Sequence, residues 1–223
     1  MAPAQPYDVA LDLGTLRVLP SAGHDGLVRP LLLAAEPGPG PTDVTALERS
    51  LDHPTFSFLE HAHGRGFDVC LIGYADGDGP LDQLSGPVRQ AVGHALRTRA
   101  GAEPLTVGGV GRGALAARHA LLRMEEEGLH PETRFHYAVN SAEPSAEEAE
   151  YLTRRGNLPK TTENVKLITL SPEADTGSAP LLDPAYDDVY VTPAPGPGPG
   201  PLLPEDLATC LLNCLTAPAG SRL

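Results

Sequence analysis

Several features that would assign a protein to a class are missing from this sequence. Its 223 residues include no tryptophan, only 4% aromatic residues and three cysteines, which form no CxxC pair. No apolar run approaches the 18 or so residues of a membrane-spanning helix, so we expect no membrane partner. The first residues show no basic stretch followed by an apolar one, which argues against a signal peptide. We therefore expect a cytoplasmic protein with reduced thiols.

Positive charge is also scarce. The 16 Lys and Arg residues stand against 29 Asp and Glu residues, for a formal net charge of −13. This balance argues against a nucleic-acid partner, because phosphate binding requires clustered basic side chains. An apolar content of 41% is ample for one core, so residues 1–223 are expected to form a single domain. The 24 glycines and 24 prolines predict many short loops.

Apolar runs alternate with helix-period segments along the chain. This pattern predicts an α/β fold, a mostly parallel sheet flanked by helices on both faces. The period-two alternation of residues 7–19, interrupted at Gly14, predicts an N-terminal strand or hairpin. Other expected strands are residues 27–34, 67–74, 105–108, 133–140, 165–170 and 188–191. Helices are expected from 44 onward with a break or kink at Pro54, at 81–99, after 113, at 146–155 and at 204–216.

The central strands of the predicted sheet are expected to be buried, and few residues are expected outside the sheet, its helices and the short loops between them. The residues expected to be buried in it are Leu31, Leu33, Val69, Leu71, Val107, Tyr137, Val139, Leu167 and Ile168. The Pro/Gly run at 193–201 is expected to be an extended spacer. The chain has no long insertion between Asn140 and Val165, so we expect little or no lid over the site.

The most informative segment is residues 104–120, which read PLTVGGVGRGALAARHA. An apolar strand leads into a glycine-rich turn and then a helix, which is the setting of a G-x-S-x-G nucleophile elbow. Gly109 and Gly113 occupy the flanking positions, where small residues let strand and helix approach closely. Gly111 takes the nucleophile's place and has no side chain with which to attack a carbonyl.

This motif and the element order resemble esterase- and lipase-like α/β-hydrolases. Such proteins typically read G-x-S-x-G-G-L-x-A-R-x-A-L, and residues 109–121 here read GVGRGALAARHAL, so Ser is replaced by Gly111 and a Gly by Ala114. The resemblance implies an α/β-hydrolase-like fold over residues 25–215. It also implies that Arg118 has a structural role, tying its helix to neighbouring loops.

The resemblance further implies the chain order nucleophile, acid, base. The acid would follow the strand at 165–170, where Glu173 and Asp175 are available. The base would follow the last strand, but the last histidine of the sequence is His136. Loss of triad members lowers the rate by orders of magnitude. Ordinary acyl transfer is therefore not expected, and no catalytic residue is assigned.

Two functional hypotheses remain open. The first is a non-hydrolytic pseudoenzyme that binds a small molecule or a partner protein, with Gly111 leaving a vacated volume where backbone N–H groups receive a ligand oxygen. The second is a repurposed cyclase, lyase or isomerase of bacterial specialised metabolism, working by positioning and acid–base groups. The candidate groups for this second hypothesis are Tyr74, Asp76, Glu143 and Asp175.

Any ligand is expected at the loops that leave the carboxyl ends of the strands. Arg112 is the basic side chain of this region, and it either holds an anionic ligand, points to solvent or pairs with a nearby acid. No cofactor or metal is expected. The predicted ligand-binding residues are Glu36, Tyr74, Asp76, Gly111, Arg112, Gly113, Asn140, Ser141, Ser171 and Asp175.

Other patterns favour less specific interpretations. Gly109, Gly111 and Ala114 also fit the dinucleotide fingerprint G-x-G-x-x-[GA], but the motif lies mid-chain and the next strand ends in Asn140 rather than an acid. His61 and His63 stand two residues apart, on different faces of a helix, which does not suit metal binding. Ser141 and Ser171 each follow a strand at its carboxyl end, but neither has an adjacent histidine to activate it. The helix of His119 is expected to carry it away from the strand ends, and His24 could approach the site only through a flexible N-terminal loop.

Overall fold

The computed structural model describes residues 4–21, 25–53, 55–170, 185–193 and 202–217. The strands, in chain order, are β1 (Tyr7–Leu11), β2 (Gly14–Leu19), β3 (Leu31–Ala34), β4 (Asp52–His53), β5 (Phe56–Ser57), β6 (Val69–Tyr74), β7 (Leu105–Val110), β8 (Thr133–Val139), β9 (Glu163–Leu170) and β10 (Asp188–Pro193). The helices are α1 (Val44–Leu51), α2 (Phe58–Gly64), α3 (Leu81–Thr98), α4 (Arg112–Glu126), α5 (Ala146–Arg154) and α6 (Glu205–Thr216).

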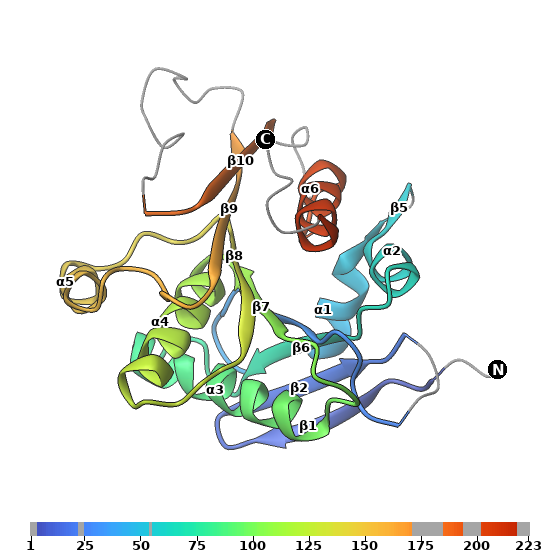
Figure 1. The fold of residues 1–223 in the computed structure, drawn as a ribbon, viewed down its shortest axis with the longest axis horizontal. Coiled ribbons are helices and arrows are strands. Elements are labelled where there is room, and N and C mark those ends of the chain that lie inside the picture. The colour runs from blue at the N-terminus through green and yellow to red at the C-terminus, as the bar shows by residue number, and fades with distance from the viewer. Residues whose placement is uncertain (1–3, 22–24, 54, 171–184, 194–201, 218–223) are drawn as a thin grey trace.

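The described residues form one eight-stranded sheet in the order β1-β2-β6-β3-β7-β8-β9-β10 (Figure 1). β1 and β2 are an antiparallel hairpin, and β2 also runs antiparallel to β6. All other neighbouring strands are parallel. The predicted α/β class, with its mostly parallel sheet and N-terminal hairpin, is therefore confirmed.

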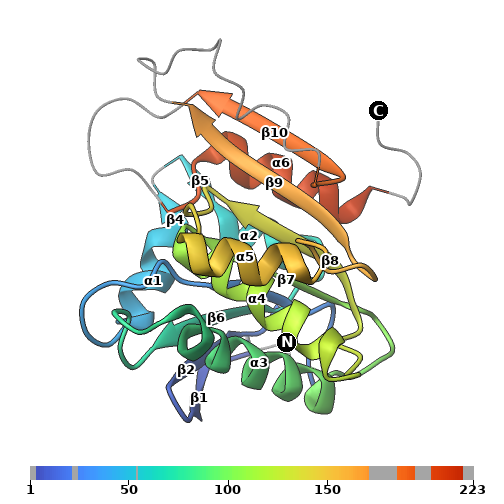
Figure 2. The ribbon, with the colours of Figure 1, turned by 90° about the vertical axis from the view of Figure 1, so that its left-hand side faces the viewer.

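Helices cover both faces of the sheet. α3 and α4 pack against each other and against β6, β7 and β8 on one face, and Figure 2 shows them with α5 in front of the sheet. α1, α2 and α6 lie on the other side, where α1 and α2 contact β6 and α6 contacts β9 and β10 (Figure 1). Strands buried on both faces read as continuous apolar runs, which explains why β3, β6 and β7 are buried at every position.

The predicted core is largely correct. All the expected sheet residues are buried except Ile168, which is half-buried. Ile168 pairs with Val191 of the edge strand β10, so fewer elements cover it than cover the central strands. At the centre, the Tyr137 hydroxyl donates a hydrogen bond to the Leu32 carbonyl oxygen at 2.8 Å. A side chain at Gly108 would collide with the Tyr137 ring, so this glycine makes room for the largest core residue.

One predicted strand boundary was wrong for a local reason, whereas the predicted interruption of the helix that begins at residue 44 is observed. The expected strand 27–34 begins only at Leu31, because Arg29 has a φ of +45° and Pro30 has no N–H to donate to a ladder. The expected helix from residue 44 ends at Leu51, and the short β4–β5 hairpin separates it from α2. Ser57 begins α2 by accepting a hydrogen bond from the Glu60 N–H, whereas Pro54 lies outside the described residues.

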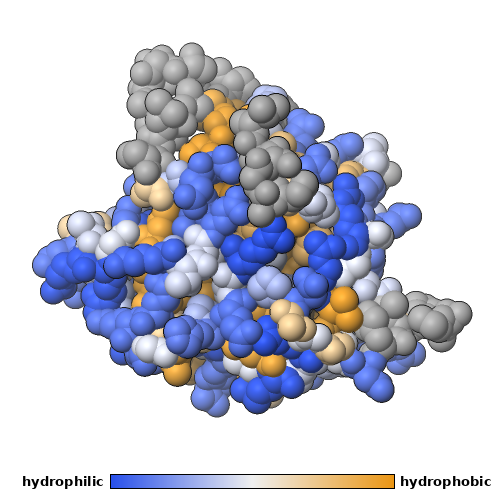
Figure 3. Space-filling view, in the orientation of Figure 1, coloured by the Kyte–Doolittle hydropathy of each residue, from blue (hydrophilic) through white to orange (hydrophobic). Residues whose placement is uncertain are grey.

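The surface agrees with the strongly acidic composition. Hydrophilic residues cover most of the described surface in Figure 3, and apolar residues appear there as separate patches. Among the described residues, none of the helices has the length and apolar character needed to cross a membrane.

The burial of the central strand β6 can be tested by truncating a side chain. Leu71 is fully buried, so Leu71→Ala should lower the free energy of unfolding by about 2–5 kcal/mol. Leu13, which is 41% exposed at the β1–β2 turn, is the matched control, and Leu13→Ala should change stability by less than about 0.5 kcal/mol. Urea denaturation measures both values. A loss below about 0.5 kcal/mol for Leu71→Ala would contradict the placement of β6 in the core.

A buried histidine should make the fold sensitive to acid. His136 in β8 is fully buried, and its Nδ1 lies 3.2 Å from Oδ1 of Asn164. Burial lowers the pKa of His136 to about 3, with a further contribution from the positive charge of Arg118. The native state therefore keeps this imidazole neutral, while the unfolded chain takes up a proton as the pH falls below about 6.5. The free energy of unfolding consequently falls as the pH is lowered.

Replacing His136 should remove this dependence. Between about pH 6 and pH 4.5, the wild type should lose up to about 1.4 kcal/mol per pH unit more than His136→Asn. Urea denaturation of both proteins across this range gives the two slopes, and any loss of packing in the variant affects its stability but not the comparison of slopes. Equal slopes would show that His136 does not stay neutral in the native protein.

Candidate functional site

The turn between β7 and α4 has the sharp geometry expected of a nucleophile elbow. Gly111 adopts φ 56° and ψ −123° and directly precedes the first residue of α4. Its N–H donates to the Val139 carbonyl at 2.9 Å, and its own carbonyl accepts from the Ala142 N–H at 3.0 Å. These bonds fix the turn to the end of β8. A positive φ with this ψ is a region that glycine reaches readily and other residues reach only with strain.

The flanking glycines allow the close approach that the sequence predicted. A Cβ atom on Gly113 would lie 2.0 Å from the Ala35 carbonyl oxygen, and one on Gly109 would lie 2.7 Å from the Ala34 carbonyl oxygen. Any side chain at either position would therefore push α4 and β7 away from the end of β3. The spacing of glycines in this motif follows from backbone packing.

A carboxylate fills the space beside Gly111. Oε2 of Glu36, in the loop after β3, lies 1.1 Å from where a Cβ atom of Gly111 would stand. The same oxygen accepts a hydrogen bond of 2.9 Å from the Arg112 N–H, the first amide of α4. The expectation of a vacated volume with a free backbone N–H was therefore wrong. The missing side chain of Gly111 is what gives Glu36 room to reach the helix N-terminus.

Burial raises the pKa values of both Glu36 and Tyr74. Desolvation raises the pKa of Glu36, although its bond to the Arg112 N–H and the charge of Arg112 act in the opposite direction. Tyr74, at the end of β6, is 2% exposed, and among the described residues its hydroxyl has no hydrogen-bond partner. Burial raises the pKa of Tyr74, and the charge of Glu36 raises it further. The site thus combines a destabilised carboxylate with a buried neutral phenol.

The Arg112 side chain is engaged by α5. Its Nη2 lies 2.6 Å from Oε1 of Glu148, and hydrogen bonds from Arg112 lower the pKa of that carboxyl group. Glu148 also belongs to a capping box, in which Ser145 Oγ accepts from the Glu148 N–H and Glu148 accepts from the Ser145 N–H. Of the alternatives open from the sequence, pairing with an acid is the one observed. The Ser145-x-x-Glu148 spacing was the available signal for this acid.

The remaining predicted ligand-binding residues that the structure describes are Asp76, Asn140 and Ser141, which follow strands at the same sheet edge and make local contacts. Asp76 is exposed, and its Oδ1 accepts from the Asp78 N–H. Asn140 has a φ of +44°, and its Oδ1 accepts from both the N–H and the hydroxyl of Thr169, which links β8 to β9. The Ser141 hydroxyl lies 3.4 Å from the Ala142 carbonyl oxygen. Ser171, Glu173, Asp175 and His24 lie outside the described residues. The expected spacer at 193–201 also lies outside them, except for Pro193, which is the last residue of β10.

The other basic candidates are structural where the structure describes them. Arg118 hydrogen-bonds through Nε to the Asn157 carbonyl oxygen at 2.5 Å and through Nη2 to the Asn157 side chain, so it ties α4 to the loop before β9. His119 is buried on α4 and stacks on Tyr151, with ring centroids 4.5 Å apart. Burial lowers the pKa of His119.

The paired histidines of α2 bind backbone oxygens. His61 Nδ1 lies 2.8 Å from the Ser57 carbonyl and His63 Nε2 lies 3.1 Å from the Leu19 carbonyl. Across the part of the chain that the structure describes, no group of three or more His, Cys, Asp or Glu side chains is placed to hold a metal ion. A dinucleotide pyrophosphate bound at the glycine turn would lie against the Glu36 carboxylate, and the two negative charges would repel each other. The turn therefore does not suit the dinucleotide-binding interpretation of Gly109, Gly111 and Ala114.

Comparison with known proteins places the fold. No protein-family model matches the sequence, and no curated protein sequence gives a significant match. The chain is similar in structure to a predicted CIB-like hydrolase from Thermoplasma acidophilum, with 11% identity over 95% of this chain and 97% of that one and a TM-score of 0.59. The carboxylesterase EstE1, cloned from a metagenomic library, gives 11% identity, 97% and 91% coverage and a TM-score of 0.59.

The esterase LipW from Mycobacterium marinum is also similar. It gives 18% identity over 94% of this chain and 78% of its own, with a TM-score of 0.57. These structures share the arrangement of a mostly parallel sheet flanked by helices. The chain therefore has the α/β-hydrolase fold.

Proposed function

We propose that this protein is a non-hydrolytic α/β-hydrolase-like protein that uses the inherited site to bind a small molecule or a partner. The observation that carries the proposal is the Glu36 carboxylate, which occupies the nucleophile's space beside Gly111 and accepts the Arg112 N–H. In a serine hydrolase, the N–H of the residue after the nucleophile helps to stabilise the oxyanion. Here the Arg112 N–H already donates to the negatively charged Glu36 carboxylate, which would also repel a developing oxyanion.

The sequence supports the same conclusion independently. No histidine follows His136, so a base is missing from the place after β10 where the fold would supply one. Gly111 provides no nucleophile. Attack on an ester needs both an activated nucleophile and a proton acceptor. These absences agree with the position of Glu36, and the cytoplasmic location expected from the sequence is part of the proposal.

The charges at the site favour a ligand that donates hydrogen bonds. Arg112 is paired with Glu148, while Glu36 and Asp76 place carboxylates at the sheet edge. We therefore replace the anionic ligand inferred from the sequence with a ligand that carries N–H donors or a positive charge. Such a group donates a charge-assisted hydrogen bond to the Glu36 carboxylate, which contributes about 1.5–3 kcal/mol.

Restoring the nucleophile should not restore hydrolysis. Gly111→Ser should show no turnover of p-nitrophenyl esters above the uncatalysed rate, because no histidine follows the final strand to take the serine proton. It should also lose on the order of 1–3 kcal/mol of stability, since the new Cβ meets Glu36 and the backbone is strained for a residue other than glycine. Ester hydrolysis assays and urea denaturation measure the two effects.

A double variant separates the steric effect from the chemical one. Glu36→Ala in the Gly111→Ser background removes the colliding carboxylate and should recover part of the lost stability while remaining inactive. Robust hydrolysis by either variant would mean that another group acts as the base and would overturn the non-hydrolytic proposal.

Ligand binding at the sheet edge should depend on Glu36. In an NMR screen of small amines and amides, compounds that bind should shift the amide signals of residues 111–113. Glu36→Gln should lower the affinity of these compounds by about tenfold or more. Arg112→Ala serves as the control at the same turn and should leave their affinity within about threefold, because its side chain is committed to Glu148. Binders that map elsewhere, or that need Arg112 rather than Glu36, would contradict this assignment.

A repurposed enzyme is the second candidate, favoured by the raised pKa of Glu36 and by the buried Tyr74 hydroxyl, which has no hydrogen-bond partner among the described residues. A carboxylate of raised pKa and a phenol that its charge influences are suited to proton transfer without a covalent intermediate. The test is exchange of α-hydrogens for deuterium in a panel of carbonyl compounds in D₂O. Exchange that is lost in both Glu36→Gln and Tyr74→Phe would favour the enzyme over the binding protein.

A further inference from the structure

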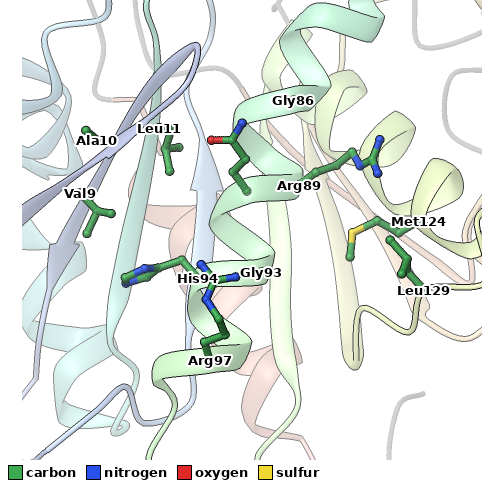
Figure 4. A pocket seen from close by; sticks show the side chains of 11 residues that line it. Val9, Ala10, Leu11, Gly86, Arg89, Gly93, His94, Arg97, Met124 and Leu129 are labelled. Atoms are coloured by element: carbon green, nitrogen blue, oxygen red, sulfur yellow. The ribbon is translucent and has the colours of Figure 1, made fainter.

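A hollow on the outer face of α3 lies away from the glycine turn. It has a volume of about 550 Å³ and is bordered by β1 on one side and by the end of α4 and the loop after it on the other (Figure 4). Met124, on its border, lies roughly 18 Å along the axis of α4 from Arg112. The lining residues are Val9, Ala10, Leu11, Gly86, Arg89, Gln90, Gly93, His94, Arg97, Met124 and Leu129.

Two glycines form the floor of this hollow. Gly86 and Gly93 are seven residues apart, which places them on one face of α3, two turns from each other. A Cβ atom at Gly86 would meet open space, and one at Gly93 would lie 3.3 Å from Nη1 of Arg97. The absence of a side chain at Gly93 therefore leaves room for the Arg97 guanidinium to lie against the helix (Figure 4).

The charge of the lining is positive. Arg89 is neutralised by an ion pair with Glu127, but among the described residues Arg97 has no carboxylate partner. His94 is next to Arg97, and its pKa is lowered by burial and by the positive charge of Arg97. No Asp or Glu lines the hollow. Although the net charge of the chain is −13, the lining of this hollow is locally positive and suits an anion.

The polar and apolar parts of the lining are separated. Gln90 is bound on both of its amide atoms by Asp12 at the β1–β2 turn, so an acidic group stands near that part of the groove. Arg97 is two turns further along α3 and provides the cationic end. The walls are apolar, with Val9 and Leu11 on β1 and Met124 and Leu129 opposite, and Leu129 is 47% exposed (Figure 4).

We propose that this hollow binds an amphiphilic anion, a medium-chain carboxylate whose head group pairs with Arg97 and whose alkyl chain lies between β1 and the end of α4. A carboxylate matches the planar donor fork of a guanidinium. The stretch from Gly86 to Arg97 spans roughly 16 Å along α3, longer than the extended chain of decanoate. Burying the chain also covers Leu129 and its apolar neighbours.

The proposal can be tested with decanoate below its micellar concentration, using calorimetry and NMR shift mapping on the full chain. Decanoate should bind and shift the signals of α3 and β1. Arg97→Gln should weaken this binding at least about tenfold, the effect of losing a charge-assisted pair. Arg154→Gln is the matched control, because Arg154 is an exposed arginine on α5, and it should leave the affinity unchanged.

A second variant blocks the groove without threatening the fold. Gly93→Leu fills the floor of the hollow. A Cβ atom at this position would meet only the flexible end of Arg97, and leucine is a strong helix former in place of glycine, so the variant should remain folded. It should abolish decanoate binding. The two probe controls are acetate, which lacks the chain, and decanol, which lacks the charge, and both should bind at least tenfold more weakly than decanoate.

The proposal is overturned if decanoate fails to bind at every submicellar concentration, or if it shifts signals only outside α3, β1 and the end of α4. It is also overturned if Arg97→Gln and Gly93→Leu bind decanoate as tightly as the wild type. Preferential binding of an acidic peptide over decanoate would also reject the small-molecule assignment. None of these results bears on the glycine turn, so the proposed function is tested separately.

Discussion

The close contact of backbone at Gly109 and Gly113 is the constraint on which the rest of this site depends. The carbonyl oxygens of Ala34 and Ala35 stand where side chains at these positions would be, so β7 and α4 can meet the end of β3 only through glycines. This contact directs the first amide of α4 toward the loop that carries Glu36. It also forces Gly111 into a turn that few other residues could adopt at low free-energy cost.

The electrostatic arrangement around the turn follows from that geometry. The N-terminus of α4 presents an unpaired N–H and a partial positive charge, and a carboxylate from the neighbouring loop satisfies both. The same helix end carries the Arg112 guanidinium, which turns outward to Glu148 and joins α5 to α4. The pairings leave a site whose remaining charge is negative, so its chemistry differs from that of a serine hydrolase with the same backbone.

The two proposed sites lie at opposite ends of α4 and differ in charge. At the N-terminal end, Glu36 and Asp76 favour donors and cations. At the C-terminal end, the groove over α3 exposes Arg97 between apolar walls and favours an amphiphilic anion. Glycines create both sites, since Gly111 admits a carboxylate and Gly93 admits a guanidinium. In each case a missing side chain makes room for a charged group from another residue.

Much of the fold could be predicted from local patterns in the sequence. The alternation of apolar runs and helical segments determined the α/β class, and the hairpin at residues 7–19 and the glycine turn followed from period-two alternation and from Gly109-x-Gly111-x-Gly113. The failure in the first parallel strand was also local, because the backbone of Arg29 shortened it. A small hairpin interrupts the helix that begins at residue 44, near the break expected at Pro54.

The sequence by itself determined that Gly111 has no nucleophilic side chain and that no histidine follows His136. Only the tertiary structure decided what occupies the resulting space and which acid holds Arg112. Glu36 reaches Arg112 across 76 residues of chain and Glu148 reaches it across 36. Such pairings depend on which strands are neighbours in the sheet, and side-chain chemistry read along a sequence does not specify that order. The positions of Glu36 and Glu148 therefore emerge only when β3, β7 and β8 lie side by side.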